Sequence, residues 1–169
     1  MSKYNRTLAI VKPDAVERGL DGKVVAAALE EGFRLVAAKR GIVTAKGWRR
    51  FYAEHDGKPF FEPLVTFMAS GPVLVIALEW VGVAGDPNYV VQRWRWLLGA
   101  TDSRNAGPGT LRARFGDKTG DAIYRNVAHG SDSHEAAEKE LAFFFHPSDL
   151  DPHSLLVPFL PPPITGSTG

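Results

Sequence analysis

The chain has 169 residues, 44% of them hydrophobic, and this length and composition favour one domain with an apolar core. Its net charge of +1 gives no broad basic surface that would predict binding to nucleic acid or to an anionic membrane. The absence of cysteine excludes disulfide bonds and thiolate metal sites, no apolar run is long enough to span a bilayer, and we expect a cytoplasmic protein with no membrane or nucleic-acid partner.

Apolar periodicity and turn-forming residues divide the chain into short strands and helices. In chain order we expect a strand (8–11), a helix (22–31), a strand (33–44), two helices (45–55 and 60–69), a strand (73–79), two more helices (88–98 and 133–140) and a strand (141–145). Gly32 is placed to end the first helix, and Ser133 to cap the last one. Residues 99–120 are rich in glycine and charge, which predicts a long irregular loop of the kind that often carries function.

This order of elements predicts an α+β sandwich, in which helices cover an antiparallel sheet. We expect one domain over residues 1–146. Residues 147–169 are rich in proline, which cannot continue a helix or a central strand. They should form an extended tail that either wraps the surface or is mobile.

One histidine stands out by its surroundings, in the segment Asn126-Val127-Ala128-His129-Gly130-Ser131-Asp132-Ser133. Histidine can act as a nucleophile or proton carrier near neutral pH, and Gly130 removes a side chain where a substrate would approach the ring. An isolated histidine beside glycine can also be structural or merely exposed. The flanking pattern, which no other histidine of the chain has, favours a catalytic role for His129.

This segment and several others resemble the nucleoside diphosphate kinase family, and they follow that family's order between about residues 6 and 145. The other matching segments are residues 7–16, Tyr52 with residues 59–65, residues 70–73, Arg95 with residues 98–101, and residues 108–112. The resemblance implies a ferredoxin-like α+β sandwich with a four-stranded antiparallel sheet covered by helices. It also implies transfer of the γ-phosphate of a nucleoside triphosphate, mainly ATP, to a nucleoside diphosphate by a ping-pong mechanism through a phosphohistidine.

The resemblance also implies roles for individual residues. The catalytic set that it implies is His129 as the nucleophile, with Lys12, Tyr52, Ser131 and Glu140. The nucleotide-binding set that it implies is Lys12, Phe60, Leu64, Arg95, Thr101, Arg112 and Asn126. Mg²⁺ is implied as a cofactor bridged by nucleotide phosphates, with no tight protein site. The expected partners are ATP, other nucleoside tri- and diphosphates, and further copies of the chain in a dimer-based tetramer or hexamer.

The residue types suit phosphoryl transfer, which requires neutralised oxygens and aligned reacting atoms. The common glycine-rich phosphate loop with its lysine is absent, so separate cations, Lys12, Arg95 and Arg112, must meet the charge. Phe60 and Leu64 lie four residues apart on one helix face and would hold the base by apolar contact, which tolerates any base. Alternatively, Phe60 and Leu64 could belong to the apolar core. Glu140, for its part, could form an ordinary salt bridge instead of supporting the histidine.

Two other functions fit the residues less well than the kinase does. A catalytically weak relative could serve as a nucleotide-binding or regulatory scaffold, but the full catalytic set favours the enzyme. A histidine phosphatase is disfavoured because its arginine-histidine-glycine signature is missing. The chain departs from the family by extra residues in 81–92 and in 115–126, both expected near the mouth of the site, and by Ser103 and Arg114, which bear on loop packing and subunit contacts.

Overall fold

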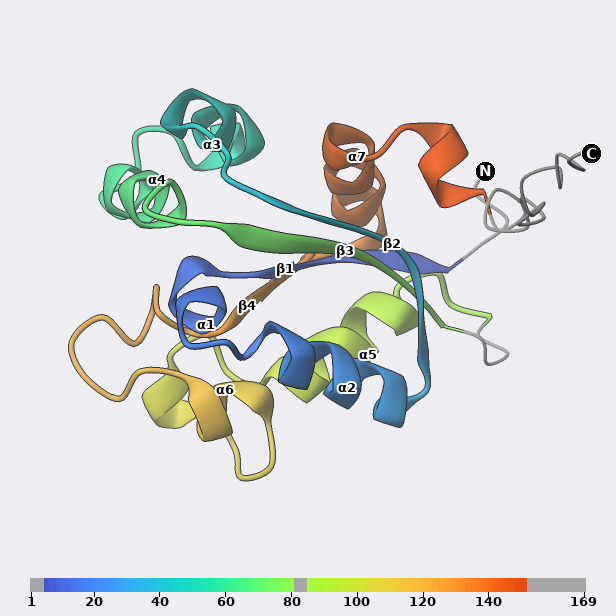
Figure 1. Cartoon of the computed structure of the whole chain (residues 1–169), viewed down its shortest axis with the longest axis horizontal. Coiled ribbons are helices and arrows are strands. Elements are labelled where there is room, and N and C mark those ends of the chain that lie inside the picture. Colours follow the sequence, from blue (N-terminus) through green and yellow to red (C-terminus); the bar gives the residue numbers. More distant parts are fainter. Residues whose placement is uncertain (1–4, 81–84, 152–169) are drawn as a thin grey trace, which may run out of the picture.

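The fold is built on a four-stranded antiparallel sheet with the strand order β2-β3-β1-β4 (Figure 1). A computed structural model describes residues 5–80 and 85–151. Its strands are β1 (Arg6–Val11), β2 (Phe33–Gly41), β3 (Val73–Trp80) and β4 (Ala128–Gly130). The expected ferredoxin-like α+β class is therefore confirmed.

Helices cover both faces of this sheet. The α-helices are α1 (Pro13–Glu17), α2 (Asp21–Glu31), α3 (Ala45–Phe51), α4 (Phe61–Met68), α5 (Tyr89–Leu98), α6 (Leu111–Phe115) and α7 (His134–Phe144). Short 3-10 helices are η1 (Ala53–His55), η2 (Ser103–Asn105) and η3 (Pro147–Leu150). Figure 1 shows α3, α4 and α7 on one face and α2, α5 and α6 on the other. None of the helices in the described ranges has the length and apolar character needed to cross a bilayer.

Strand β1 is buried along its whole length because helices pack on both of its faces. Side chains alternate along a strand, so Leu8 and Ile10 join the core beneath α3, α4 and α7. Ala9 and Val11 enter the opposite core, beneath α1, α2 and α5. The sheet thus separates two apolar layers, and packing on both of its faces fixes the position of β1.

Several helix boundaries follow the signals in the sequence. Gly32 ends α2 with a φ of 107°, a left-handed conformation that glycine adopts without steric cost. Ser133 caps α7, since its side chain accepts a hydrogen bond from the Ala136 amide. Thr110 caps α6 in the same way, and α6 with η2 lies inside residues 99–120, which were expected to be irregular throughout.

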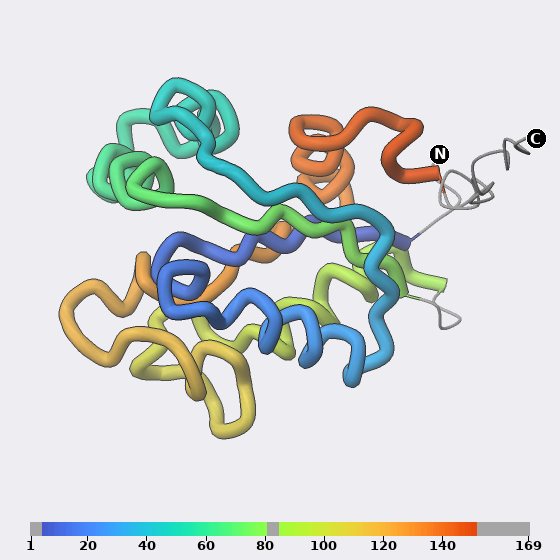
Figure 2. The backbone as a smooth tube through the Cα atoms, viewed as in Figure 1, coloured from blue at the N-terminus to red at the C-terminus, as the bar shows by residue number. Residues whose placement is uncertain are grey.

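The expected last strand over residues 141–145 is wrong, because α7 continues to Phe144. Leu141 and Phe145 are buried against the sheet face that carries Leu8 and Ile10, and this packing overrides the strand preference of consecutive phenylalanines. The true fourth strand is β4, whose three residues are too few to give a periodic pattern. Figure 2 follows the long connection from α6 that swings away from the sheet and returns to it as β4.

The first of the two extra segments does not lie where the sequence predicts. Register between β1 and β3 pairs Arg6 with Glu79 and Val11 with Leu74, so the chain after Trp80 leaves the sheet at the opposite end from Lys12. The expectation that residues 85–92 lie near the mouth of the site is therefore wrong, while residues 81–84 lie outside the described residues. The proline-rich tail is described only to Asp151, with η3 at its start, and the rest also lies outside.

Candidate active site

The predicted site residues surround one open pocket of about 420 Å³ at the end of β1 and β4. Its lining includes most of the predicted set, namely Lys12, Tyr52, Phe60, Leu64, Arg95, Thr101, Arg112, Asn126 and His129. Ser131 and Glu140 do not line it but stand behind the histidine. The fold therefore brings most of the predicted residues together around one pocket, although they lie far apart in the sequence.

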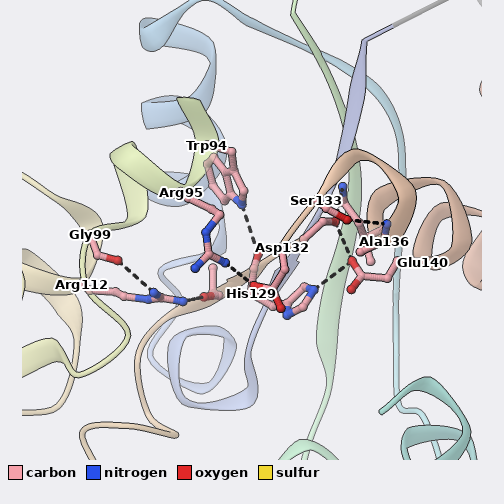
Figure 3. Close-up of polar contacts among 12 residues, drawn as sticks. Trp94, Arg95, Gly99, Arg112, His129, Asp132, Ser133, Ala136 and Glu140 are labelled. Carbon is pink, nitrogen blue, oxygen red and sulfur yellow. Dashed lines mark hydrogen bonds and ion pairs between the residues drawn. The ribbon is translucent and has the colours of Figure 1, made fainter. Parts of the chain in front are cut away.

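The backbone of His129 is held from two sides. It lies in the middle of β4, where it pairs with Ile10 of β1. The indole Nε1 of Trp94, from α5, donates a hydrogen bond of 3.1 Å to the His129 carbonyl (Figure 3). The imidazole packs edge-on against Phe51 and Tyr52, with ring centroids 5.6 and 6.2 Å away. Only 16% of the His129 side chain is exposed, so the ring has little freedom to turn.

Glu140 and Ser131 determine which nitrogen of the ring faces the pocket. The Nε2 atom of His129 lies 3.1 Å from a Glu140 carboxylate oxygen, as Figure 3 shows. The Ser131 hydroxyl donates to the same oxygen at 2.6 Å and fixes the carboxylate in turn. A carboxylate beside Nε2 favours the tautomer with its proton there. The Nδ1 lone pair is then left for an electrophile.

A strained turn immediately precedes β4, the strand that carries His129. Val127 has a φ of 79°, and the Ala128 amide bonds to the Asn126 carbonyl at 3.0 Å, which together form a classic γ-turn. This conformation is costly for a β-branched residue. Two groups after β1 hold it, because the Lys12 amide donates to the Val127 carbonyl and the Asp14 carboxylate accepts from the Val127 amide.

Lys12 is a buried cation at the floor of the pocket. It is only 5% exposed, and its Nζ donates to the Asn126 amide oxygen at 2.7 Å and to the Tyr124 carbonyl at 3.3 Å. Burial, followed by repulsion from Arg112, lowers the pKa of Lys12 from 10.5 to about 7, although the Asp14 charge opposes this shift. A bound anion would restore the charged form.

Arg112 and Arg95 complete the positive end of the pocket. Arg112 donates to the backbone carbonyls of Gly99, Asn126 and Ala128, so it also clamps both ends of the γ-turn. Burial, followed by repulsion from Arg95, lowers the pKa of Arg112 to about 10. Arg95 is more exposed and forms an ion pair of 2.6 Å with Asp132 (Figure 3). Both guanidinium groups keep N–H donors beyond these bonds.

Asn126 and Thr101 are joined to one another as well as to the pocket. The Asn126 side chain, 1% exposed, accepts from Lys12 and donates to the carbonyls of Thr101 and Ile123. Its polar atoms thus hold the cation and two loops in place. Thr101 is exposed at the rim, where its hydroxyl is accessible to a ligand.

One wall of the pocket is aromatic and apolar. Phe60, 37% exposed, and Leu64 lie on it as expected, whereas neighbouring Phe61 is 5% exposed and belongs to the core. Sequence reasoning missed His55 and Ile123 on this wall. His55 stacks near Tyr52 at 6.1 Å and meets Phe60 edge-on at 5.4 Å. His55 could have been predicted, because it lies between Tyr52 and Phe60 in the sequence. No sequence feature pointed to Ile123.

The hydroxyl of Tyr52 is a poor source of an anion. Burial raises the pKa of this phenol well above its usual range, and the Glu140 charge adds to the effect. Tyr52 is therefore neutral at physiological pH, and its contact with the imidazole is the edge-on packing of the two rings.

The pocket offers little to an isolated metal ion. Within residues 5–80 and 85–151, no three histidine or carboxylate side chains converge to hold a metal. Asp132 is the one carboxylate in the described lining of the pocket. Magnesium typically uses one or two carboxylates together with substrate phosphates, and this donor set fits such an ion arriving with its nucleotide.

Comparisons with known proteins agree with this geometry. A family model described as nucleoside diphosphate kinase matches residues 5–150. A nucleoside diphosphate kinase of Pyrococcus furiosus is 41% identical over 150 residues, which cover 89% of this chain and 88% of that protein. The crystal structure of the Aquifex aeolicus nucleoside diphosphate kinase superposes with a TM-score of 0.76 at 39% identity, covering 86% of this chain and 98% of that one. The Halobacterium salinarum enzyme, solved in complex with CDP, gives 0.75 at 37% identity and covers 88% and 91%.

Gly130 should be needed for the placement of His129. A Cβ added there would lie 2.7 Å from Cδ1 and 3.0 Å from Nε1 of Trp94. We expect Gly130→Ala to cost roughly 1–3 kcal/mol in the free energy of unfolding, as overpacked sites do, and to lower phosphotransfer. Urea unfolding and turnover measure the two effects. Gly22→Ala, where a Cβ meets no atom within 4 Å, is the control. It should lower neither the free energy of unfolding nor the turnover.

The buried charge of Lys12 should make stability depend on pH in a predictable direction. Its pKa is lower in the folded chain, so its protonation opposes folding fully below about pH 7, and this penalty disappears as the pH rises toward 10.5. Relative to Lys12→Met, the wild type should therefore gain about 1.4 kcal/mol or more of unfolding free energy between pH 7 and 10, the equivalent of at least one pKa unit. Urea unfolding of both proteins measures this difference, and a difference constant with pH would contradict it.

Proposed function

The chain belongs to the nucleoside diphosphate kinase family, and we propose that His129 is the residue through which it passes phosphoryl groups. It is an enzyme that moves the γ-phosphate of a nucleoside triphosphate, mainly ATP, to a nucleoside diphosphate in two successive half-reactions. The observation that carries the proposal is the bond between His129 Nε2 and Glu140, which leaves Nδ1 for the pocket.

In the first half-reaction, Nδ1 of His129 attacks the γ-phosphorus in line with the leaving oxygen. The bond from phosphorus to the bridging oxygen breaks, and the nucleoside diphosphate departs with that electron pair. Glu140 stabilises the positive charge that the ring gains, and Ser131 holds Glu140 in place. In the second half-reaction, a terminal oxygen of another diphosphate attacks phosphohistidine and regenerates the free imidazole, so no net proton change is required of the ring.

Lys12, Arg95 and Arg112 supply the charge that this transfer requires. Phosphoryl transfer is catalysed mainly by positioning and electrostatic stabilisation, and one arginine directed at the transferring group is worth roughly 10³–10⁵ in rate. Burial lowers the pKa of Lys12 and of Arg112, and the nearby Asp14 carboxylate offsets this only in part. Phosphate oxygens of the nucleotide would supply further negative charge beside both cations. Asn126 and Thr101 add neutral donors or hold these cations in register.

Broad base specificity follows from the wall built by Phe60, Leu64 and Ile123. It presents faces and methyl groups, and every base has a π-face that can lie on them. The related enzyme of Halobacterium salinarum was solved with CDP, which supports a pyrimidine nucleotide as one ligand of this pocket.

We extend the proposal to the cofactor, the assembly and the location. Mg²⁺ would enter with the nucleotide, where it neutralises phosphate charge, and Asp132 is the carboxylate within reach. The chain should act in the cytoplasm, which its lack of cysteine suits, and should form a homo-oligomer based on dimers. A catalytically weak nucleotide-binding scaffold is the alternative that the complete site disfavours.

Replacing the nucleophile separates the enzyme from the scaffold. We expect His129→Ala to remove transfer from ATP to a second nucleoside diphosphate. The variant should still fold, because His129 belongs to neither of the two apolar core clusters. Labelled ATP should leave acid-labile, base-stable phosphate on the wild type and none on the variant. His134→Ala is the control and should keep both label and turnover. Retained label in His129→Ala would assign the intermediate to another residue.

Glu140 is proposed as a positioning residue, and its replacement should affect kcat without affecting KM. Glu140→Gln keeps the size of the side chain but removes the charge that stabilises the ring, so we expect kcat to fall on the order of 10²-fold. KM for the nucleotide should stay unchanged, because Glu140 does not line the pocket. Glu135→Gln, on an exposed position of α7, is the matched control. A rise in KM with unchanged kcat would show that Glu140 acts on binding instead.

A further inference from the structure

A second cavity lies outside the nucleotide site, and the mechanism uses none of its residues. It has a volume of about 610 Å³, against about 420 Å³ for the nucleotide pocket. It lies along α7 and η3, two elements that Figure 1 shows on the same side of the sheet as α3. We refer to it as the α7–η3 groove, defined by Leu141, Ala142, Phe144, Phe145, Pro147 and Leu150.

The groove is mainly apolar. Leu141 and Phe145 are buried and belong to the core on this side of the sheet, while Phe144 and Leu150 are only partly covered. The charged side chains along it, Arg6 and Glu138, have opposite signs. Because exposed apolar concavities of this size mark binding sites, the groove calls for an uncharged, apolar occupant.

The chain itself supplies a segment of that chemistry. Residues 155–160 read Leu-Leu-Val-Pro-Phe-Leu, and no Asp, Glu, Lys or Arg occurs from residue 152 to residue 169. The family model ends its match at residue 150, so this segment belongs to a part of the chain beyond the shared domain.

The point where the described chain ends puts this segment within reach. Leu150 lines the groove and Asp151 is the last described residue of the domain, so residue 155 follows the groove wall by five residues, at most about 18 Å of extended chain. A short tether gives an intramolecular segment a high effective concentration. Pro158 and the prolines at 161–163 limit the freedom of the unbound segment, which lowers the entropic cost of binding.

We propose that residues 155–160 bind in the α7–η3 groove of their own chain and cover its apolar wall. The segment serves as a strap that shields α7, the helix that carries Glu140, from solvent and from other partners.

Disulfide trapping in the full-length protein tests this, since the natural chain has no cysteine to interfere. Ala142→Cys places a thiol on an exposed position of the groove, and Pro161→Cys places one just after the apolar segment without removing it. Lys139→Cys, on the same helix but outside the groove, is the matched partner for Pro161→Cys. We expect the 142–161 pair to oxidise at least about tenfold faster than the 139–161 pair, given its higher effective concentration.

Replacement of two apolar anchors provides the second arm. Adding Leu156→Ser and Phe159→Ser to the 142–161 pair should lower its oxidation rate to that of the 139–161 pair. Equal rates for the two pairs, or no response to the serine changes, would overturn the proposal. Non-reducing electrophoresis separates the products, and a crosslinked dimer in place of a crosslinked single chain would assign the groove to the tail of a second copy and would equally refute binding within one chain.

Discussion

The γ-turn at Val127 is the constraint on which the site depends. Its left-handed backbone costs roughly 1–3 kcal/mol for a residue of this type and persists only because neighbours hold it. Lys12 and Asp14 bind it from the end of β1, and Arg112 clamps its two flanking carbonyls. Residues proposed to bind phosphate therefore also fix the turn that starts β4. A change in Lys12 or Arg112 would therefore move His129 as well as a positive charge of the pocket.

Burial of cations is the second feature that gives the site its character. Lys12 and Arg112 are almost fully buried, and burial lowers the pKa of both. Repulsion from a neighbouring cation adds to this effect, from Arg112 on Lys12 and from Arg95 on Arg112. These cations lie at the end of β1 and β4, which the two apolar layers hold in place. In the proposed mechanism, the phosphate oxygens of the nucleotide supply the negative charge that these cations lack. Binding and charge stabilisation thus act through the same groups, with little reorganisation when the phosphoryl group moves.

The two ends of the pocket differ in how far their side chains are buried. Lys12 and Arg112 are buried and bonded to backbone carbonyls, so their positions are set by the fold. Phe60 and Thr101 are exposed at the rim and contact little that would fix a base in one orientation. This division suits an enzyme that must position phosphorus closely while it accepts several bases. It also separates the catalytic machinery from the α7–η3 groove, which shares α7 but none of the pocket's lining.

The sequence by itself determined most elements with clear periodicity and the helix caps at Gly32 and Ser133. It also predicted most of the residues that line the pocket, because the motifs carry them in short contiguous segments. It could not find β4, which is three residues long and stable only as a partner of β1. It also could not exclude a strand over residues 141–145. There the packing of Leu141 and Phe145 on the sheet favours the helix α7 instead. The register of β1 and β3 placed residues 85–92 away from the site. Only tertiary structure decides such points, because they depend on contacts between residues distant in sequence.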